Sequence, residues 1–208
     1  MQNLRQHRRR VAKIINQATA EDFHSQSGKR GMSFESLINA SNALYRQKGW
    51  AVVDKVATPF RQVGIHKGGV FLAVRDQAST VDYYGCFQGR ALVFEAKSTR
   101  ETTRLPHDNF HPHQIEYLRD ALQQGAIAFS LIEFAKLDET YLLPAQYLVD
   151  SWEKGLVGGR KSIPIEHMRM FGTEVHPGRG IPLDYLAVVQ QLWKRVDATK
   201  EKNNEFDA

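Results

Sequence analysis

The chain has 208 residues, a length that suits one ordinary domain with a hydrophobic core. Its 42% hydrophobic residues fit a globular protein, and the lack of any run of about 18 apolar residues excludes a transmembrane helix. A single cysteine, Cys86, excludes an internal disulfide and a cysteine-rich zinc site, so we expect a cytoplasmic protein with no membrane partner. The net charge of +5 is only a weak indication of a polyanionic partner.

The first 30 residues are polar and basic, with no acidic residue before Glu21. Such a composition buries too little apolar surface to form a core, so we expect residues 1–30 to be a mobile basic tail. Lys29 and Arg30 close this tail directly before the first long helix. Both are candidate contacts to a polyanion such as DNA.

The first long helix is predicted to begin at Phe34, with Ser33 as its N-cap, and to end at Gly49. Apolar residues recur at helical spacing along it, so one face of the helix packs on a core. A strand follows at 50–56, and Pro59 ends it.

Residues 60–79 combine a strand-like apolar run at 70–74 with three glycines, which indicates a flexible projection. Three basic side chains lie in this segment and are further candidate DNA contacts: Arg61, Lys67 and Arg75. For any one of them alone, a solvated surface is the better explanation.

A β-hairpin is predicted over residues 81–97, with Gly89 in its turn. Its first strand carries Asp82, and its second carries Glu95 and Lys97. Because residues two apart share one face of a strand, Glu95 and Lys97 point the same way. Carboxylates bind hard divalent cations, and a lysine near the attacking water assists phosphodiester cleavage. The hairpin therefore predicts a divalent-metal nuclease site.

Asp, Glu and Lys are common residues, and this spacing also occurs by chance. Phe94 and Ala96 flank Glu95, however, which places the acid next to the sheet core rather than on a solvated face. Basic residues lie on both sides of the hairpin, Arg104 among those that follow it, and favour a phosphate-facing surface. For Lys97, a surface salt bridge to Glu95 explains the pair equally well.

The elements predicted after the hairpin follow one another in chain order: a loop at 98–109, a helix at 113–124, strands at 126–134 and 140–143, a helix from 144 to about 152, a loop at 155–162, a helix at 183–196 and a charged, disordered tail at 197–208. Helices before, between and after the strands predict an α/β sandwich around a mixed sheet. One domain over residues 31–196 accounts for the whole pattern.

Three histidines, His107, His111 and His113, lie close together in the sequence. A zinc site would need a fourth ligand and a tight geometry. Their position between a loop and a helix favours phosphate contact or packing at the helix end. A histidine acting as general base is the weaker alternative, because the carboxylate–lysine site already supplies an activated water.

Several segments, in this order and spacing, are far more specific than the three hairpin residues: Gly28-Lys29-Arg30-Gly31-Met32, Gln77-Ala78-Ser79-Thr80-Val81-Asp82-Tyr83, Phe94-Glu95-Ala96-Lys97, Asn109-Phe110-His111-Pro112-His113-Gln114, Gly159-Arg160-Lys161-Ser162-Ile163-Pro164 and Leu183-Asp184-Tyr185-Leu186. From about Gly28 to about Tyr185 the chain resembles the RecU family of bacterial Holliday-junction resolvases. That family belongs to the restriction-endonuclease-like, PD-(D/E)xK nuclease superfamily.

The resemblance implies an α/β fold with a restriction-endonuclease-like core, in which helices flank a central mixed β-sheet and a stalk over about 60–79 protrudes. It also implies a homodimeric, Mg²⁺-dependent endonuclease, with Mn²⁺ as an alternative ion. Such an enzyme resolves four-way junctions in recombination, DNA repair and chromosome segregation, and branch-migration or recombination proteins are candidate partners.

The same resemblance implies roles for individual residues. Asp82 and Glu95 correspond to the family's metal-binding acids, and Lys97 to its catalytic lysine. Thr80 and Gln114 correspond to polar residues that complete the site around the metal.

Three of the polar residues also suit a purely structural role. Glu35, on the first long helix, corresponds to a further acid near the metals, but the helix dipole also favours an acid in the first turn. Gln114 also suits a helix N-terminus, and Thr80 is a good strand residue. The chain departs from the family in a shorter stalk and in Arg75 and Asp76, which stand where relatives often carry an aromatic and then a basic residue.

Two alternative functions keep the same core. A sequence-specific restriction-type endonuclease would read base edges in the major groove, whereas a resolvase reads junction shape through backbone contacts. A non-catalytic architectural protein would bind junctions without cutting them. Clustered carboxylates count against the latter, because their negative charge weakens DNA binding without a metal.

Overall fold

The computed structural model describes residues 33–57, 59–65, 71–75 and 80–194. The tails expected at 1–30 and 197–208, with Lys29 and Arg30, and the stalk residue Lys67 lie outside the described residues. The elements, in chain order, are α2 (Phe34–Gln47), β1 (Ala51–Lys55), β2 (Phe60–Ile65), β3 (Phe71–Arg75), β4 (Tyr83–Phe87), β5 (Arg90–Thr99), β6 (Arg104–Pro106), the 3-10 helix η2 (His107–Asn109), α3 (Pro112–Gln123), β7 (Ile127–Phe134), β8 (Glu139–Pro144), α4 (Ala145–Leu156), β9 (Ser162–Pro164), α5 (Ile165–Phe171) and β10 (Thr173–Glu174), followed by a helix at 185–194.

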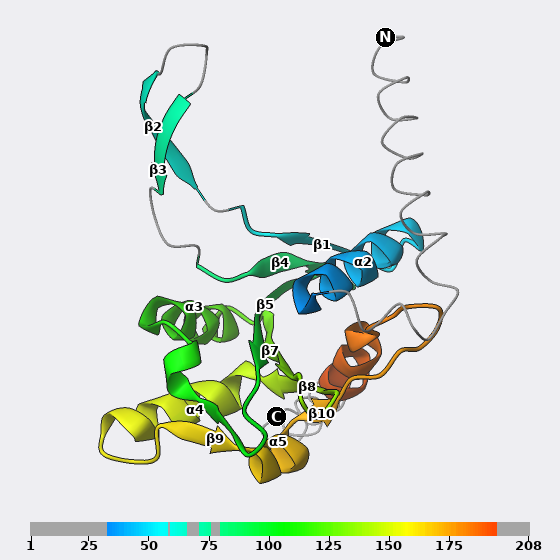
Figure 1. The fold of residues 1–208 in the computed structure, drawn as a ribbon. Coiled ribbons are helices and arrows are strands. Elements are labelled where there is room, and N and C mark those ends of the chain that lie inside the picture. The colour runs from blue at the N-terminus through cyan, green and yellow to red at the C-terminus, as the bar shows by residue number, and fades with distance from the viewer. Residues whose placement is uncertain (1–32, 58, 66–70, 76–79, 195–208) are drawn as a thin grey trace, which may run out of the picture.

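A six-stranded mixed sheet in the order β1-β4-β5-β7-β8-β10 forms the centre of the protein (Figure 1). The β5–β7 pair is parallel and the other pairs are antiparallel. Two small sheets, β2–β3 and β6–β9, lie outside it. The β2–β3 hairpin projects away from the body of the protein (Figure 1), as expected for a stalk.

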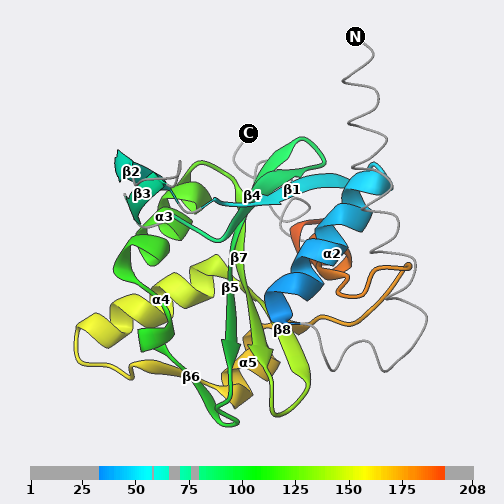
Figure 2. The ribbon, with the colours of Figure 1, turned by 45° about the horizontal axis from the view of Figure 1, so that its top comes forward.

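The sheet separates two hydrophobic cores. Figure 2 shows α2 on one side of the sheet and α3 and α4 on the other. Along β5, Phe94 enters the core beneath α2 while its neighbour Val93 enters the core beneath α3 and α4, as period-two alternation requires. Helices on both faces of a mixed sheet confirm the predicted α/β fold class.

Three stacked aromatic rings join the strands at the centre of the α2 side. The rings of Tyr83 on β4 and Phe94 on β5 lie 4.7 Å apart, and those of Phe94 and Phe129 on β7 lie 4.8 Å apart. All three side chains are buried, so they fix the lateral position of the strands on which the candidate site is built.

Local signals in the sequence are confirmed where the chain makes caps and turns. The Ser33 side chain accepts a hydrogen bond from the backbone N–H of Ser36 and caps α2. The β4–β5 turn is formed by Gln88 and Gly89, with φ of 51° and 78°. Two residues with positive φ form the tight turn whose twist suits a hairpin.

Elements that depend on distant partners differ from the prediction. The loop expected at 98–109 is largely ordered, because β5 continues to Thr99 along β7, and β6 pairs with β9 some 60 residues away in the chain. The helix expected to end near 152 continues to Leu156. The strand β2 lies in the glycine-containing segment expected to be a flexible projection, and the short elements α5 and β10, of seven and two residues, are also absent from the prediction.

No helix within the described residues is both long and apolar enough to cross a membrane.

Replacing Gly85 with alanine should destabilise the fold. A Cβ at this position would press on the Val52 carbonyl oxygen and lie 2.8 Å from the Val53 Cα, so β1 and β4 would have to separate. Overpacking of this kind costs about 1–3 kcal/mol in the free energy of unfolding, measurable by urea denaturation. Cys86→Ala, at the exposed neighbouring residue, is the control and should change stability by less than about 0.5 kcal/mol. Equal stability of the two variants would contradict the close β1–β4 packing.

Candidate active site

The hairpin brings the two predicted acids together. Asp82 lies directly before β4 and Glu95 lies in β5, and the register pairs Tyr83 with Phe94. The backbone N–H of Asp82 donates to Glu95 Oε2 over 3.1 Å, and the backbone N–H of Ala96 donates to Asp82 Oδ2 over 3.0 Å. Each acid is therefore held by the backbone of the strand that carries the other.

Glu95 is fully buried and accepts hydrogen bonds from three groups. Besides the Asp82 N–H, Lys97 Nζ lies 2.6 Å from Oε1, and Gln114 Nε2 donates to the same oxygen. Burial, together with the hydrogen bond and the charge of Asp82, raises the pKa of Glu95 to about 8, although the Lys97 ammonium acts in the opposite direction. The carboxyl groups of Asp82 and Glu95 thus lie side by side, and a positive charge beside them favours the ionised form of Glu95.

Lys97 and Gln114 are oriented by neighbours that the motif does not contain. The Lys97 ammonium lies 5.6 Å from the centre of the Phe110 ring, and its side chain stays 19% exposed. Gln114, on the first turn of α3, accepts from the His111 N–H over 2.9 Å through Oε1. Its NH₂ group therefore faces Glu95. The Gln114 amide is hydrogen-bonded through both its oxygen and its nitrogen, so it holds the Glu95 carboxyl group in position.

Glu35 lies near the site but outside the hydrogen-bonded cluster. Its carboxylate pairs with Lys55 Nζ at 2.5 Å, and both side chains are about half exposed. Burial raises the pKa of Tyr83, and the charges of Glu35 and Asp82 raise it further, so both acids lie near this phenol. The Tyr83 hydroxyl also donates to Asn39 Oδ1 on α2 over 3.0 Å. The first turns of α2 thus reach the same end of β4 as Asp82.

The other predicted site residues take more peripheral positions. Thr80 is exposed two residues before Asp82, and no hydrogen bond joins it to the other described site residues. Arg104 is exposed at the start of β6, and Arg61 is exposed on β2 of the stalk. Arg75 ends β3, but its side chain lies outside the described structure.

The three histidines do not act as one group. His107 is buried, its Nε2 lies 3.0 Å from Ser151 Oγ, and burial lowers its pKa. The rings of His111 and His113 stack on one another with centres 5.4 Å apart. Within the described part of the chain, no three His, Cys, Asp or Glu side chains gather to hold a metal ion. Any cation here would depend on two carboxylates with backbone and water oxygens.

Sequence reasoning missed Lys55, Asn39 and Phe110 as neighbours of the site. Lys55 is one strand-end residue among several, and Asn39 is one polar residue on a helix, so neither carries a local signal. Both become neighbours of the site because α2 packs against β1 and β4. Phe110 could have been found, because it stands four residues before Gln114 and is the apolar residue in a polar segment.

Removing the Glu95 charge should make the metal-free protein more stable at alkaline pH. The folded-state pKa of about 8 lies above the ordinary value of 4.5, so the folded protein keeps a proton that the unfolded chain releases. The free energy of unfolding therefore falls as the pH rises through this window. In urea denaturation with EDTA, we expect Glu95→Gln to exceed the wild type at about pH 8, with a difference that shrinks towards pH 5.

The control for this experiment is Glu101→Gln, which removes the same charge from an exposed position. Its difference from the wild type should stay nearly constant with pH. A pH-independent difference for Glu95→Gln would contradict the raised pKa.

Comparisons with known proteins agree with one another. The family model described as Recombination protein U (RecU) matches residues 29–191. A Holliday junction resolvase RecU from Streptococcus equi subsp. zooepidemicus (strain MGCS10565) is 43% identical over 167 residues, which cover 78% of this chain and 82% of the relative. A Holliday junction resolvase RecU from Geobacillus sp. (strain WCH70) is 39% identical over 176 residues, which cover 82% and 88% of the two chains.

Among solved structures, Archaeoglobus fulgidus Hjc, a Holliday junction resolvase from an archaeal hyperthermophile, aligns with a TM-score of 0.37 and 18% identity, over 64% of this chain and 90% of its own. The family model and the curated relatives each extend over more than two thirds of the chain. The chain therefore belongs to the Recombination protein U (RecU) family.

Proposed function

We propose that this protein is an endonuclease that resolves four-way (Holliday) DNA junctions by phosphodiester hydrolysis, in homologous recombination, DNA repair and chromosome segregation. The buried Glu95 carboxylate, joined by hydrogen bonds to Asp82, Lys97 and Gln114, carries the proposal. A desolvated acid beside a second acid opposes folding and is typical of catalytic sites. Relatives in the family bear the name Holliday junction resolvase, which indicates the substrate. The setting is the bacterial cytoplasm, with branch-migration or recombination proteins as partners.

The proposed cofactor is Mg²⁺, with Mn²⁺ as a substitute, held by Asp82 and Glu95. Mg²⁺ prefers oxygen ligands and keeps several waters, so two carboxylates with the Ala96 carbonyl form an adequate site. The raised pKa of Glu95 supports a cation here, because burial and the Asp82 charge both disfavour a second ionised acid. When bound, the ion lowers the pKa of a coordinated water and offsets charge on the phosphate. Thr80 and Gln114 complete the polar surroundings of the ion.

The chain's own residues position the reactants. In hydrolysis a water oxygen bonds to phosphorus while the P–O bond to the departing strand end breaks. Lys97 is partly exposed and 2.6 Å from Glu95 Oε1, so its ammonium can turn to the water or to a phosphate oxygen. Gln114 keeps the Glu95 carboxylate in place through its amide. Glu35 and Lys55 form an exposed pair at the rim, where Glu35 would add a further acid near the ion.

Cleavage of a labelled four-way junction beside a linear duplex of the same arm sequence tests the proposal. We expect paired nicks in the junction only, with Mg²⁺ and not with EDTA. Asp82→Asn keeps the shape of the side chain but removes its charge, and should lower the single-turnover rate by about 10²-fold or more. Asp108→Asn, an exposed acid on η2, is the matched control and should cut like the wild type.

Each other outcome identifies a different function. Equal cutting of the duplex would indicate a restriction-type endonuclease that reads base edges. Tight junction binding without cutting at any Mg²⁺ or Mn²⁺ concentration would indicate an architectural protein. Cutting that persists in EDTA would contradict the metal-dependent mechanism.

A homodimer is part of the same proposal. A four-way junction needs two symmetric cuts, and the described residues contain one carboxylate site per chain, so a twofold dimer supplies the second. The face of β1 and β4 that lies opposite α2 offers a surface for the dimer interface. Val52 on β1 and Tyr84 on β4 are 50% and 54% exposed there, and Cys86 is exposed beside them. Exposed apolar side chains on neighbouring strands are typical of an interaction surface.

Sedimentation velocity tests this dimer at micromolar concentration. The wild type should sediment as a dimer, and Tyr84→Lys should shift the population towards monomer, because the new charge would be buried without a partner. Met170→Lys is the control, since it adds the same charge at an apolar residue that is 70% exposed on α5. A wild type that stays monomeric even with junction DNA would contradict the dimer, and a dimeric Tyr84→Lys would move the interface elsewhere.

A further inference from the structure

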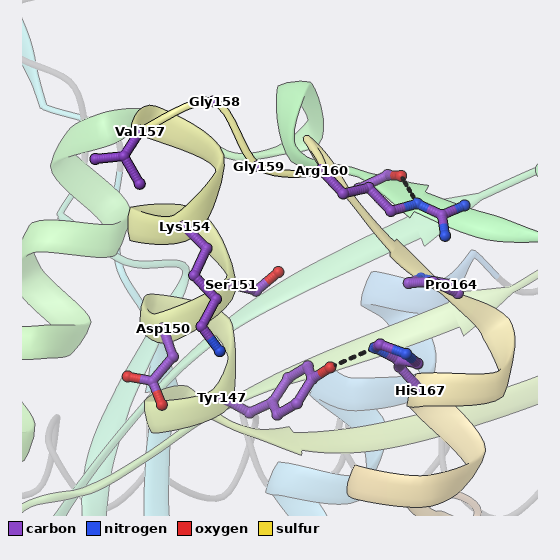
Figure 3. Close-up of a pocket in the computed structure, with 11 residues that line it drawn as sticks. Tyr147, Asp150, Ser151, Lys154, Val157, Gly158, Gly159, Arg160, Pro164 and His167 are labelled. Carbon is purple, nitrogen blue, oxygen red and sulfur yellow. Dashed lines mark hydrogen bonds between the residues drawn. The ribbon is translucent and has the colours of Figure 1, made fainter.

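A hollow of about 590 Å³ lies between α4 and the segment that forms β9 and α5 (Figure 3). It shares no residue with the carboxylate site. One wall is the face of α4 that carries Tyr147 and Lys154, and the other contains Arg160 and His167. Nothing in the proposed hydrolysis requires this hollow.

The chain folds back sharply to form the hollow. After α4 ends, the backbone N–H of Gly159 donates to the Lys154 carbonyl oxygen over 2.8 Å. A Cβ at Gly159 would lie 2.5 Å from that oxygen, so only glycine allows so close an approach. This contact returns the chain to α4 and sets Arg160 opposite the helix.

The hollow carries a net positive charge. Within the described residues, neither Lys154 nor Arg160 lies within ion-pair distance of a carboxylate. Arg160 uses its Nε to donate to Ser162 Oγ over 3.2 Å, which orients the guanidinium and leaves its other N–H groups available. The one acid of the lining, Asp150, accepts from Gln146 Nε2 over 2.8 Å.

Phosphodiester is the ligand class that suits these groups. A guanidinium, an ammonium and nearby hydroxyls are the donors that phosphate oxygens accept, and arginine matches their geometry with two parallel N–H groups. Both cations are exposed to solvent, whereas sites for small molecules are enclosed. The backbone of a nucleic acid, which can lie along an open groove, fits better than a small enclosed anion.

The hollow is tied to the active site through η2. Ser151, in the wall of the hollow, bonds to His107 Nε2, and the backbone N–H of His107 donates to the Lys161 carbonyl oxygen over 3.1 Å. η2 leads directly to His111, whose N–H fixes Gln114 beside Glu95. A phosphate in the hollow would therefore be held at a set spacing from the bond to be cut.

We propose that this hollow binds two backbone phosphates of a junction arm, outside the cleaved bond, one through Arg160 and one through Lys154. The inference rests on the proposed function. It is consistent with the arrangement in Figures 1 and 2, where the stalk, α3 and the chain after α4 lie on one side of the protein and helix 185–194 lies on the other.

Fluorescence anisotropy on a labelled four-way junction, in EDTA and over a series of salt concentrations, tests the proposal. Arg160→Ala should weaken binding roughly tenfold, because a charge-assisted hydrogen bond is lost. Each lost phosphate contact lowers the slope of log K against log salt by about 0.9, so Arg160→Ala and Lys154→Ala together should lower it by nearly 2. Lys194→Ala, which removes a charge from helix 185–194, should leave the slope unchanged.

Two further measurements separate binding from folding and relate binding to cleavage. Arg160→Lys keeps the positive charge and should retain the slope, and thermal melting of all variants should match the wild type. With enzyme well below its Kd for the junction, the cleavage rate of Arg160→Ala should fall roughly tenfold with its affinity, whereas that of Lys194→Ala should match the wild-type rate. Wild-type affinity and slope in the double variant, or the same loss in Lys194→Ala, would overturn the proposal.

The two proposals fail in different ways. A wild type that cuts no junction would refute the resolvase function, while the anisotropy series would still measure the phosphate contact. A wild type that cuts junctions, with unaltered binding by the double variant, would refute only the role of the hollow.

Discussion

The structure depends on keeping one carboxylate, that of Glu95, out of water inside a β-sheet. An isolated buried charge is strongly unfavourable, and this acid persists because three donors reach it from three different elements. The Asp82 N–H comes from the start of β4, the ammonium from two residues along β5, and the amide from α3. The Asp82 N–H reaches Glu95 only when the hairpin register is correct, and the Gln114 amide reaches it only when α3 is docked. The aromatic stack on the opposite face of the sheet holds that register, so packing on one side supports chemistry on the other.

The parts of this arrangement that the sequence predicts are those set by neighbours in the chain. The alternation of β5 places Glu95 and Lys97 on one face, and Gly89 closes the turn that brings Asp82 alongside. Gln114 is different, because it reaches Glu95 from a helix 19 residues further along the chain. No helical or strand periodicity in the sequence links Gln114 to the hairpin. Only the resemblance to a known family predicts that Gln114 belongs to the site.

What could not be predicted is set by packing between distant segments. The pairing of β6 with β9 turns an expected loop into a small sheet, and this sheet is what positions η2 beneath the start of α3. Lys55 meets Glu35 because β1 lies beside α2, a contact that neither residue type signals. The sequence after α4 is visibly rich in glycine, but glycine content alone does not show that Gly159 closes a hollow with Arg160 in its wall.

The large sheet and the β2–β3 hairpin differ in how firmly they are packed. The acids lie at the six-stranded sheet, where the central strand β5 packs against a hydrophobic core on each face. The β2–β3 hairpin stands apart, with Phe60 and Val63 67% and 52% exposed, and a two-stranded hairpin has little stability of its own. Recognition of a branched substrate needs surfaces that adjust to the angle between its arms, whereas hydrolysis needs fixed atoms. Exposed, lightly packed strands at the margin can adjust their position while the spacing of Asp82, Glu95 and Lys97 stays constant.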